Sequence, residues 1–147
     1  MIRRAGFSLI EMLIVVVVIG LMTLIAIPRL ADAFAQNNLN NVRAKIISLY
    51  AVARANAGGT SRPTVLRLSG NKIYVVSGPR LKAGAGTLDT LTPVENIYTL
   101  YGITANVSSD SILLDQSGLG RNGSTIILSK SGRADTVTIS QYGQILK

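Results

Sequence analysis

The reactive side chains of this sequence offer little for catalysis. None of the 147 residues is His or Cys, so the commonest general base, thiol nucleophiles and the usual zinc ligands are missing. The seven Asp and Glu residues are scattered, without the clustering that metal ligands need. A familiar Ser-His-Asp triad cannot be built without His. This inventory predicts a protein that is not an enzyme and that holds no metal or cofactor.

One carboxylate is distinguished by its surroundings. Glu11 is the single charged residue among residues 7–27, which are otherwise almost entirely apolar. A charge inside a membrane span costs roughly 2.5–3.5 kcal/mol on insertion scales. A carboxylate kept at such a position indicates a functional role.

The element that carries this carboxylate is predicted to be a transmembrane helix. Residues 7–27 provide 21 positions, which is long enough to cross a bilayer. Arg3 and Arg4 precede them, so the positive-inside rule places the N-terminus in the cytoplasm and the chain after Pro28 outside. The run is longer than that of a secretory signal peptide, and IAIP at 25–28 is a poor cleavage site. An ordinary uncleaved anchor is the plain alternative, although it leaves the carboxylate unexplained.

The order of these features resembles a known export signal. RRAG followed by FSLIEMLIVVVVIGLMTLIAIP is similar to the class III signal of type IV pilins and type II secretion pseudopilins. The resemblance implies that a prepilin peptidase cuts between Gly6 and Phe7 and methylates the new amine of Phe7. Residues 1–6 would then be a leader peptide, and residues 7–28 would remain as a transmembrane and filament-core helix.

The same resemblance implies a role for the carboxylate. Glu11 would pair with the Phe7 amine of a neighbouring subunit, and Pro28, which tends to kink a helix, would be a second assembly position. The implied partners are other pilin or pseudopilin subunits, the peptidase, the inner-membrane assembly platform and membrane lipid. The implied location is the bacterial inner membrane, with a single pass, a cytoplasmic N-terminus and a periplasmic C-terminal domain, and the filament after assembly.

Residues 29–57 are predicted to continue as an amphipathic helix. The run QNNLNN at 36–41 interrupts the apolar stripe at Asn38, and Ala57-Gly58-Gly59 is predicted to end the helix. The apolar positions, spaced by three, four or eight residues, are Leu30, Phe34, Val42, Ile46, Leu49 and Ala53.

The remainder, residues 60–147, is predicted to form an antiparallel β-sheet domain. Ser69-Gly70-Asn71 indicates a hairpin, and residues 78–93 are predicted to form a loop. The strand candidates are residues 64–68, 72–77, 97–107, 112–114, 125–129, 136–140 and 144–146. A long N-terminal helix, half transmembrane and half amphipathic, packed on an antiparallel sheet defines an α+β fold.

A finer resemblance connects this second half to the GspH/FimT branch of minor pseudopilins. An Ala-rich helix end leads into RPTVLRL, and LLDQSGLGRNGSTIILS lies further on. The chain departs from the branch at Gln144 and Leu146, where two arginines would stand. Within this region Gly118-x-Gly120-x-x-Gly123 matches the dinucleotide-binding fingerprint by letter. Strand-like STIILS follows it instead of a helix, so a glycine-rich hairpin connection is expected.

The positive charge leaves a second function open. The formal net charge is +8, and from Pro28 onward thirteen Lys and Arg face six Asp and Glu. The alternative is therefore a DNA-binding minor pilin of a competence pilus, with contacts from Arg121, Lys130, Arg133 and Lys147. We expect instead a solvated basic face that binds DNA no tighter than roughly 100 μM at physiological salt. The function predicted first is a minor subunit of a type II secretion pseudopilus or type IV pilus.

Overall fold

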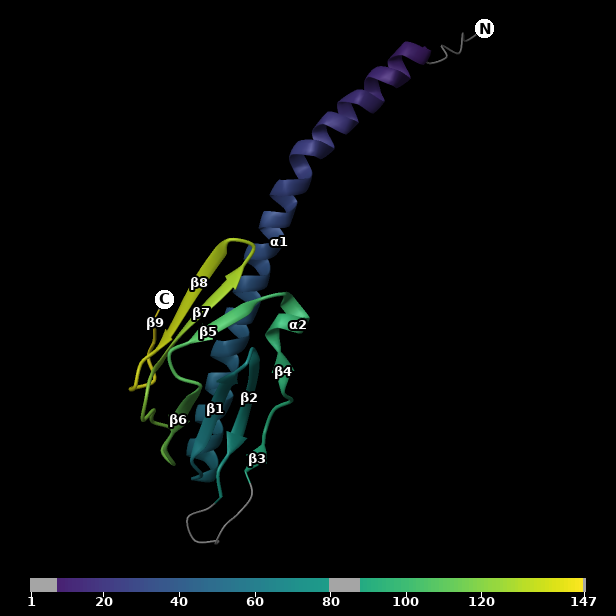
Figure 1. The fold of residues 1–147 in the computed structure, drawn as a ribbon. Helices are drawn as coiled ribbons and strands as arrows, with labels where there is room; N and C mark the ends of the chain where they lie inside the picture. Colours follow the sequence, from purple (N-terminus) through teal and green to yellow (C-terminus); the bar gives the residue numbers. More distant parts are fainter. Residues whose placement is uncertain (1–7, 80–87, 147) are drawn as a thin grey trace. The chain divides into compact units, whose positions relative to one another are not determined.

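The structure is a computed structural model that describes residues 8–79 and 88–146 (Figure 1). The chain divides into two compact units, with the boundary between Phe34 and Ala35. Helix α1 contributes to both units. In chain order the elements are α1 (Leu9–Thr60), β1 (Thr64–Ser69), β2 (Lys72–Ser77), β3 (Asp89–Thr90), β4 (Glu95–Asn96), α2 (Ile97–Tyr101), β5 (Thr104–Val107), β6 (Ser111–Leu114), β7 (Ser124–Lys130), β8 (Arg133–Ile139) and β9 (Ile145–Leu146).

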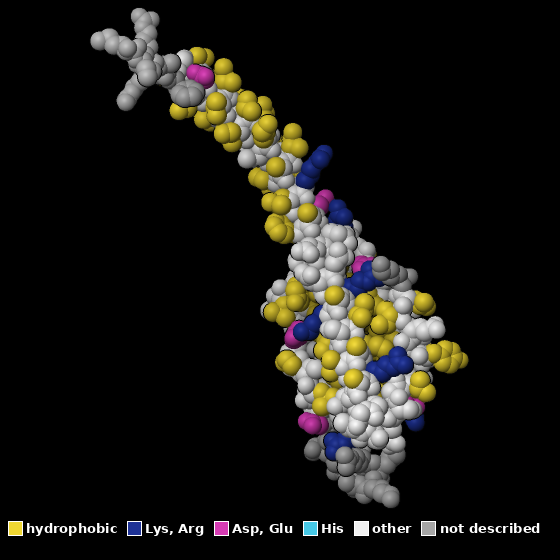
Figure 2. Space-filling model, turned by 180° about the vertical axis from the view of Figure 1, so that it is seen from behind, with side chains coloured by type: hydrophobic (Ala, Val, Ile, Leu, Met, Phe, Trp, Pro, Cys, Tyr) yellow, Lys and Arg dark blue, Asp and Glu magenta, His cyan; other side chains and the backbone are white. Residues whose placement is uncertain are grey.

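The described part of the first unit is helical from Leu9 onward and leaves its apolar side chains exposed. Its large hydrophobic residues are all at least 43% exposed, and Figure 2 shows apolar side chains over the visible side of this segment. The helix continues through Pro28. By length and composition α1 could cross a membrane.

In the second unit α1 buries one stripe. Val42, Ile46, Leu49 and Ala53 are buried as predicted. Leu30 and Phe34 of the predicted stripe are more than half exposed and belong to the first unit. The stripe is not interrupted at Asn38, because Leu39 is fully buried one residue later. Asn38 lies beside the stripe and donates its side-chain amide to the Tyr101 carbonyl at 3.5 Å.

The helix ends at Thr60, three residues after the predicted end at Ala57. Gly58 and Gly59 stay helical, and the left-handed conformation falls on Ser61, whose φ is 51°. Pro63 follows closely and disfavours helical backbone at the residue before it. The terminating signal is therefore Ser61 and Pro63 rather than the glycine pair.

The strands form two sheets instead of the single sheet expected. The five-stranded sheet has the order β3-β2-β1-β6, with β4 also pairing with β2. The four-stranded sheet has the order β5-β7-β8-β9, and all pairings in both sheets are antiparallel. The division arises because β5 pairs with β7 while the next strand, β6, pairs with β1.

The hairpin predicted around Ser69-Gly70-Asn71 is confirmed. Ser69 pairs with Lys72, so Gly70 and Asn71 are the two turn residues. Their φ angles are 58° and 63°, which are the positive values of a type I′ turn. A second tight hairpin joins β7 to β8.

Residues 97–107 do not form the predicted single strand. They form α2, a break at Gly102 and then β5. The Asn96 side chain caps α2 by accepting hydrogen bonds from the Tyr98 and Thr99 amides at 3.0 and 3.2 Å, and Gly102 ends it with a φ of 64°. These two caps override the strand preference of the residues between them. Short strand β3 also lies within the predicted loop 78–93, of which residues 80–87 are outside the described residues.

The glycine-rich segment at 118–123 connects β6 to β7, so it opens no helix and is not a dinucleotide turn. It is not a hairpin either, because the two strands belong to different sheets. A Cβ at Gly120 would lie 2.7 Å from the Gln141 carbonyl oxygen, and one at Gly123 would lie 2.6 Å from that of Ile139. Glycine is needed here for close backbone approach to the end of β8.

One core holds the second unit together. The two sheets lie along the part of α1 that begins at Ala35 (Figure 1). The core combines residues from α1, α2 and both sheets, and its largest fully buried members include Leu39, Ile46, Leu66, Ile73, Ile97, Ile103, Ile112, Leu114, Ile126, Leu128 and Ile139. This continuous core confirms the α+β arrangement of a long helix on antiparallel sheets.

Candidate assembly segment

Ser8 starts the apolar helix and sets the position of Glu11. The Ser8 hydroxyl accepts a hydrogen bond from the Ile10 amide at 3.3 Å, and its carbonyl accepts from the Met12 amide at 3.2 Å. These are the bonds of an N-cap residue. Glu11 is then the third helical residue, within the first turn. A carboxylate is favourable there because the helix N-terminus carries partial positive charge.

The spacing of Ser8 and Glu11 matches a capping box, in which Ser at the cap precedes Glu by three residues. The run S-L-I-E carries this signal in the sequence, although the predicted helix begins at residue 7. The described residues give the Glu11 side chain no hydrogen bond or ion pair, and the residue is exposed. Its carboxylate is therefore available to a group outside the described chain.

The surroundings of Glu11 contain little other polarity. Thr23 satisfies its hydroxyl locally by donating to the carbonyls of Ile19 and Gly20 at 3.1 and 2.8 Å. Such back-bonding is how a hydroxyl is tolerated in an apolar environment. Gly6 and Phe7, the predicted processing site, lie outside the described residues.

The structure does not gather the predicted DNA contacts into one patch. Lys130 pairs with Arg133 across the β7–β8 turn, whereas Arg121 precedes the opposite end of β7. Seven strand residues separate the two ends, which is about 20 Å at 3.3 Å per residue. Lys147 lies outside the described residues.

Two of these cations serve the domain itself. Lys130 donates to the Tyr101 carbonyl at the end of α2, and Arg133 donates to the Gln36 side chain at 3.5 Å. A cation at a helix C-terminus is favourable because the carbonyls there carry partial negative charge. These contacts favour a structural role over a DNA-binding role.

Two ion pairs join α1 to the sheets. Arg43 contacts Asp135 of β8 at 3.1 Å, and Lys45 contacts Glu95 of β4 at 2.8 Å. The hydrogen bond to Glu95 raises the pKa of Lys45 above its ordinary value. Among residues 8–79 and 88–146, no three His, Cys, Asp or Glu side chains are placed to hold a metal ion.

An apolar helix bearing one isolated carboxylate, followed by a sheet domain packed on the same helix, defines a filament subunit of the pilin class. Residues 1–27 match the prokaryotic N-terminal methylation motif. The chain is also 33% identical over 122 residues to the type IV narrow pilus major component PilA5 of Thermus thermophilus. That match covers 81% of this chain and 93% of the relative. The chain therefore belongs to the type IV pilin family, whose members are structural subunits.

Solved structures show the same fold. The type IV minor pilin FimU of Pseudomonas aeruginosa, in one crystal form, superposes with a TM-score of 0.57 at 15% identity, covering 76% of this chain and 88% of FimU. A second crystal form gives a TM-score of 0.54 at 16% identity, covering 74% and 90%. The predicted membership of the pilin superfamily is confirmed, and the resemblance to the GspH/FimT branch agrees with these matches. The motif and the apolar helix together indicate a membrane-anchored subunit.

Proposed function

We propose that this chain is a minor subunit of a type IV pilus or type II secretion pseudopilus, matured by cleavage between Gly6 and Phe7. The observation that carries the proposal is Glu11, a carboxylate without a partner in the described chain, in the first turn of an exposed apolar helix. Residues 1–6 are the leader, residues 7–28 cross the membrane and later line the filament core, and residues 60–147 form the sheet domain beyond the amphipathic part, 29–57.

Maturation creates the partner that Glu11 lacks. Cleavage leaves a cationic amine on Phe7, and methylation keeps its charge. Two unit charges about 4 Å apart attract by roughly 4 kcal/mol at an effective dielectric of 20, before desolvation is subtracted. This attraction offsets the cost of a carboxylate in lipid only when a neighbouring subunit supplies the amine. Pairing between subunits would thus fix their axial register.

Maturation is tested on protein extracted from membranes. We expect intact mass and N-terminal sequencing to find N-methylated Phe7 as the first residue. A stable terminus at Met1 or Ile2 in cells with active prepilin peptidase would refute the proposal.

Assembly is tested with two substitutions at one position. Glu11→Ala removes both the charge and the side chain that a capping box would use, whereas Glu11→Gln removes the charge but keeps a residue that a capping box accepts. If Glu11 acts by charge pairing, both variants should insert into the membrane and neither should be found in sheared filaments. Normal filament content of Glu11→Gln, with loss only in Glu11→Ala, would show that capping is the role of Glu11.

The proposed topology has the N-terminus in the cytoplasm and the sheet domain in the periplasm. Its support is the placement of Arg3 and Arg4 before the apolar run. A protease added to spheroplasts should degrade the sheet domain while the cytoplasmic membrane is intact. Protection of the domain in intact spheroplasts would contradict this orientation.

The assignment as a minor subunit is supported by charge. Residues 35–147 carry twelve Lys and Arg against five Asp and Glu, a net charge of +7, so closely packed identical domains repel one another. Quantitative mass spectrometry of sheared filaments should find few copies of this chain for each copy of the main subunit. Because PilA5 is described as a major component, an abundance equal to the main subunit is the result that would overturn this part.

A further inference from the structure

The outward faces of the two sheets differ in charge. On the five-stranded sheet Arg67 of β1 is exposed and lies between Tyr74 and Ser111 across the strands. On the four-stranded sheet the residues of the outward face are uncharged. They are Thr104, Asn106, Thr125, Ile127, Ser129, Ala134, Thr136, Thr138 and Leu146. Arginine and tyrosine are enriched in protein interfaces, so the outward face of the five-stranded sheet is the better candidate for a protein contact.

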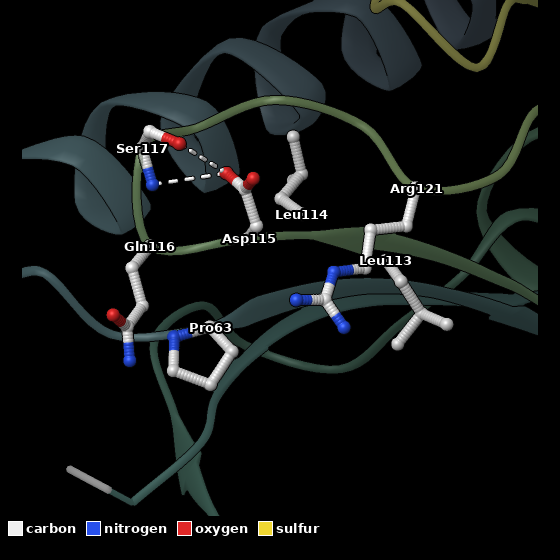
Figure 3. Close-up of a pocket in the computed structure, with 7 residues that line it drawn as sticks. All are labelled: Pro63, Leu113, Leu114, Asp115, Gln116, Ser117 and Arg121. Carbon is white, nitrogen blue, oxygen red and sulfur yellow. Dashed lines mark hydrogen bonds between the residues drawn. The ribbon is translucent and has the colours of Figure 1, made fainter.

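A pocket of about 380 Å³ opens beside that face. Its walls include Pro63, which precedes β1, and Leu113 of β6, whose side chain is 43% exposed. Arg121 extends from the β6–β7 connection toward Gln116 and Pro63 (Figure 3). The structure gives the Arg121 guanidinium no hydrogen bond or ion pair among the described residues. The pocket thus presents a cation over an apolar floor.

The one carboxylate of the pocket is already used by its own loop. Asp115 Oδ1 accepts hydrogen bonds from the Ser117 amide at 2.9 Å, the Ser117 hydroxyl at 2.8 Å and the Leu119 amide at 2.9 Å. Figure 3 shows the Asp115 side chain turned toward Ser117, away from Pro63. Arg121 nearby adds a weaker electrostatic attraction. The guanidinium therefore retains its capacity for an external anion.

The donors define the chemistry of that anion. A guanidinium offers a planar fork of N–H groups that matches a carboxylate, and the Gln116 side chain adds an amide donor on the same pocket. Pro63 and Leu113 provide an apolar surface for the methylene groups of a side chain. A Glu or Asp side chain on a protein segment satisfies both requirements, whereas the phosphates of a nucleic acid use only the cation.

A second copy of this chain is poorly equipped to supply that side chain. Of the five carboxylates in residues 35–147, Asp135 and Glu95 are engaged in ion pairs and Asp115 closes its own loop. A second copy could therefore offer only the exposed Asp89 and Asp110 of this domain. The net charge of +7 on each domain adds repulsion between copies. The complementary partner is therefore a different subunit with an acidic surface.

We propose that the pocket bounded by Pro63, Leu113, Gln116 and Arg121 binds an acidic side chain of a different pilin subunit that neighbours this chain in the filament. This inference rests on the proposed function as a filament subunit.

Cross-linking in isolated filaments tests the occupant. The chain has no Cys, so Leu119→Cys, at an exposed position of the same connection outside the pocket walls, creates a single attachment point in the full chain for a maleimide–diazirine reagent. Thr136→Cys, on the uncharged face, is the matched control. We expect the Leu119→Cys adduct to map by mass spectrometry to an Asp- or Glu-containing peptide of another pilin. An adduct with a second copy, an adduct sensitive to nuclease, equal labelling from both positions, or no adduct would overturn the proposal.

Charge reversal tests the contribution of Arg121. With the cross-linker at Leu119→Cys, adding Arg121→Glu should lower the yield of cross-linked product at least about tenfold. Adding Lys72→Glu, an equal charge change at the far end of the same sheet, should change that yield less than about twofold. Arg121→Lys should give an intermediate yield because it keeps the charge and loses the fork. Equal effects of Arg121→Glu and Lys72→Glu would contradict a specific pocket. If Glu11→Gln blocks assembly while Arg121→Glu has no effect on cross-linking, this inference fails and the proposed function stands.

Discussion

The two parts of helix α1 carry similar apolar residues in opposite environments. Ile19, before the boundary at Phe34, is 55% exposed, whereas Ile46, after it, is fully buried. Both lie in regular helix, so helical propensity does not distinguish them. The second part meets two sheets supplied by its own chain, and the first part meets nothing within the described residues of its unit.

This difference indicates where each part finds its stability. An apolar side chain gains roughly 1.5–3 kcal/mol on burial, and only the second part of α1 realises this gain within one chain. The first part must obtain it from lipid or from other subunits, as expected of a pilin. Substitutions in the two units should therefore affect different measurements, and four matched pairs test this.

The largest effect is expected from truncation of the core. Ile46→Ala should lower the free energy of unfolding of the sheet domain by about 2–5 kcal/mol, because it leaves a cavity between α1 and the sheets. Ile19→Ala should lower it by less than about 0.5 kcal/mol. Denaturant unfolding of the full chain in detergent measures both. Equal losses would mean that the two parts unfold together.

The second pair replaces glycines. Gly123→Ala should cost about 1–3 kcal/mol, because its Cβ would lie 2.6 Å from the backbone oxygen of Ile139. A Cβ added at Gly20 would meet no atom within 4 Å apart from its chain neighbours and the backbone of its own helix. Gly20→Ala should therefore leave the domain unchanged and favour the helix by up to about 1 kcal/mol. Thermal unfolding measures the stability of the sheet domain, and circular dichroism in detergent measures helix content. A stabilised Gly123→Ala variant would show that the β6–β7 connection can move.

The third pair removes helix caps. Asn96→Ala should cost the domain about 0.5–2 kcal/mol, because two amides of α2 lose their acceptor. Ser8→Ala removes the acceptor of the Ile10 amide and should fray only the start of α1, without a change in domain unfolding. Hydrogen exchange of the first-turn amides distinguishes the two outcomes. A domain destabilised by Ser8→Ala would contradict the independence of the units.

The smallest effect is expected when one carboxylate in each unit is replaced by its amide, and this effect on the melting temperature depends on pH. Hydrogen bonds from Ser117 and Leu119 hold the pKa of Asp115 below its ordinary value. Its contribution to stability is therefore present above the unfolded pKa of about 3.9 and is lost as the pH falls through the folded value. The melting temperature of Asp115→Asn should accordingly fall less than that of the wild type on acidification below about pH 4. Glu11→Gln, the matched change in the first unit, should follow the wild-type profile.

Several features were predictable because they depend on neighbouring residues. The β1–β2 hairpin follows from Gly70-Asn71, whose backbone tolerates positive φ, and the buried stripe from Val42 to Ala53 follows from helical spacing. The capping box at Ser8 was equally local and could have been recognised from its spacing alone. Residues 97–107 do not form the predicted strand, because the caps at Asn96 and Gly102 outweigh the strand propensity of the residues between them.

The sequence by itself determined the apolar helix, the isolated carboxylate at Glu11 and the class of protein, because each is encoded in a continuous run of residues. Only the tertiary structure decided that the strands divide into two sheets, that Lys130 and Arg133 serve the domain, and that Pro63 and Arg121 share a pocket. These features depend on pairing between residues far apart in the chain. Backbone hydrogen bonding and core packing select that pairing together, and no local pattern specifies it.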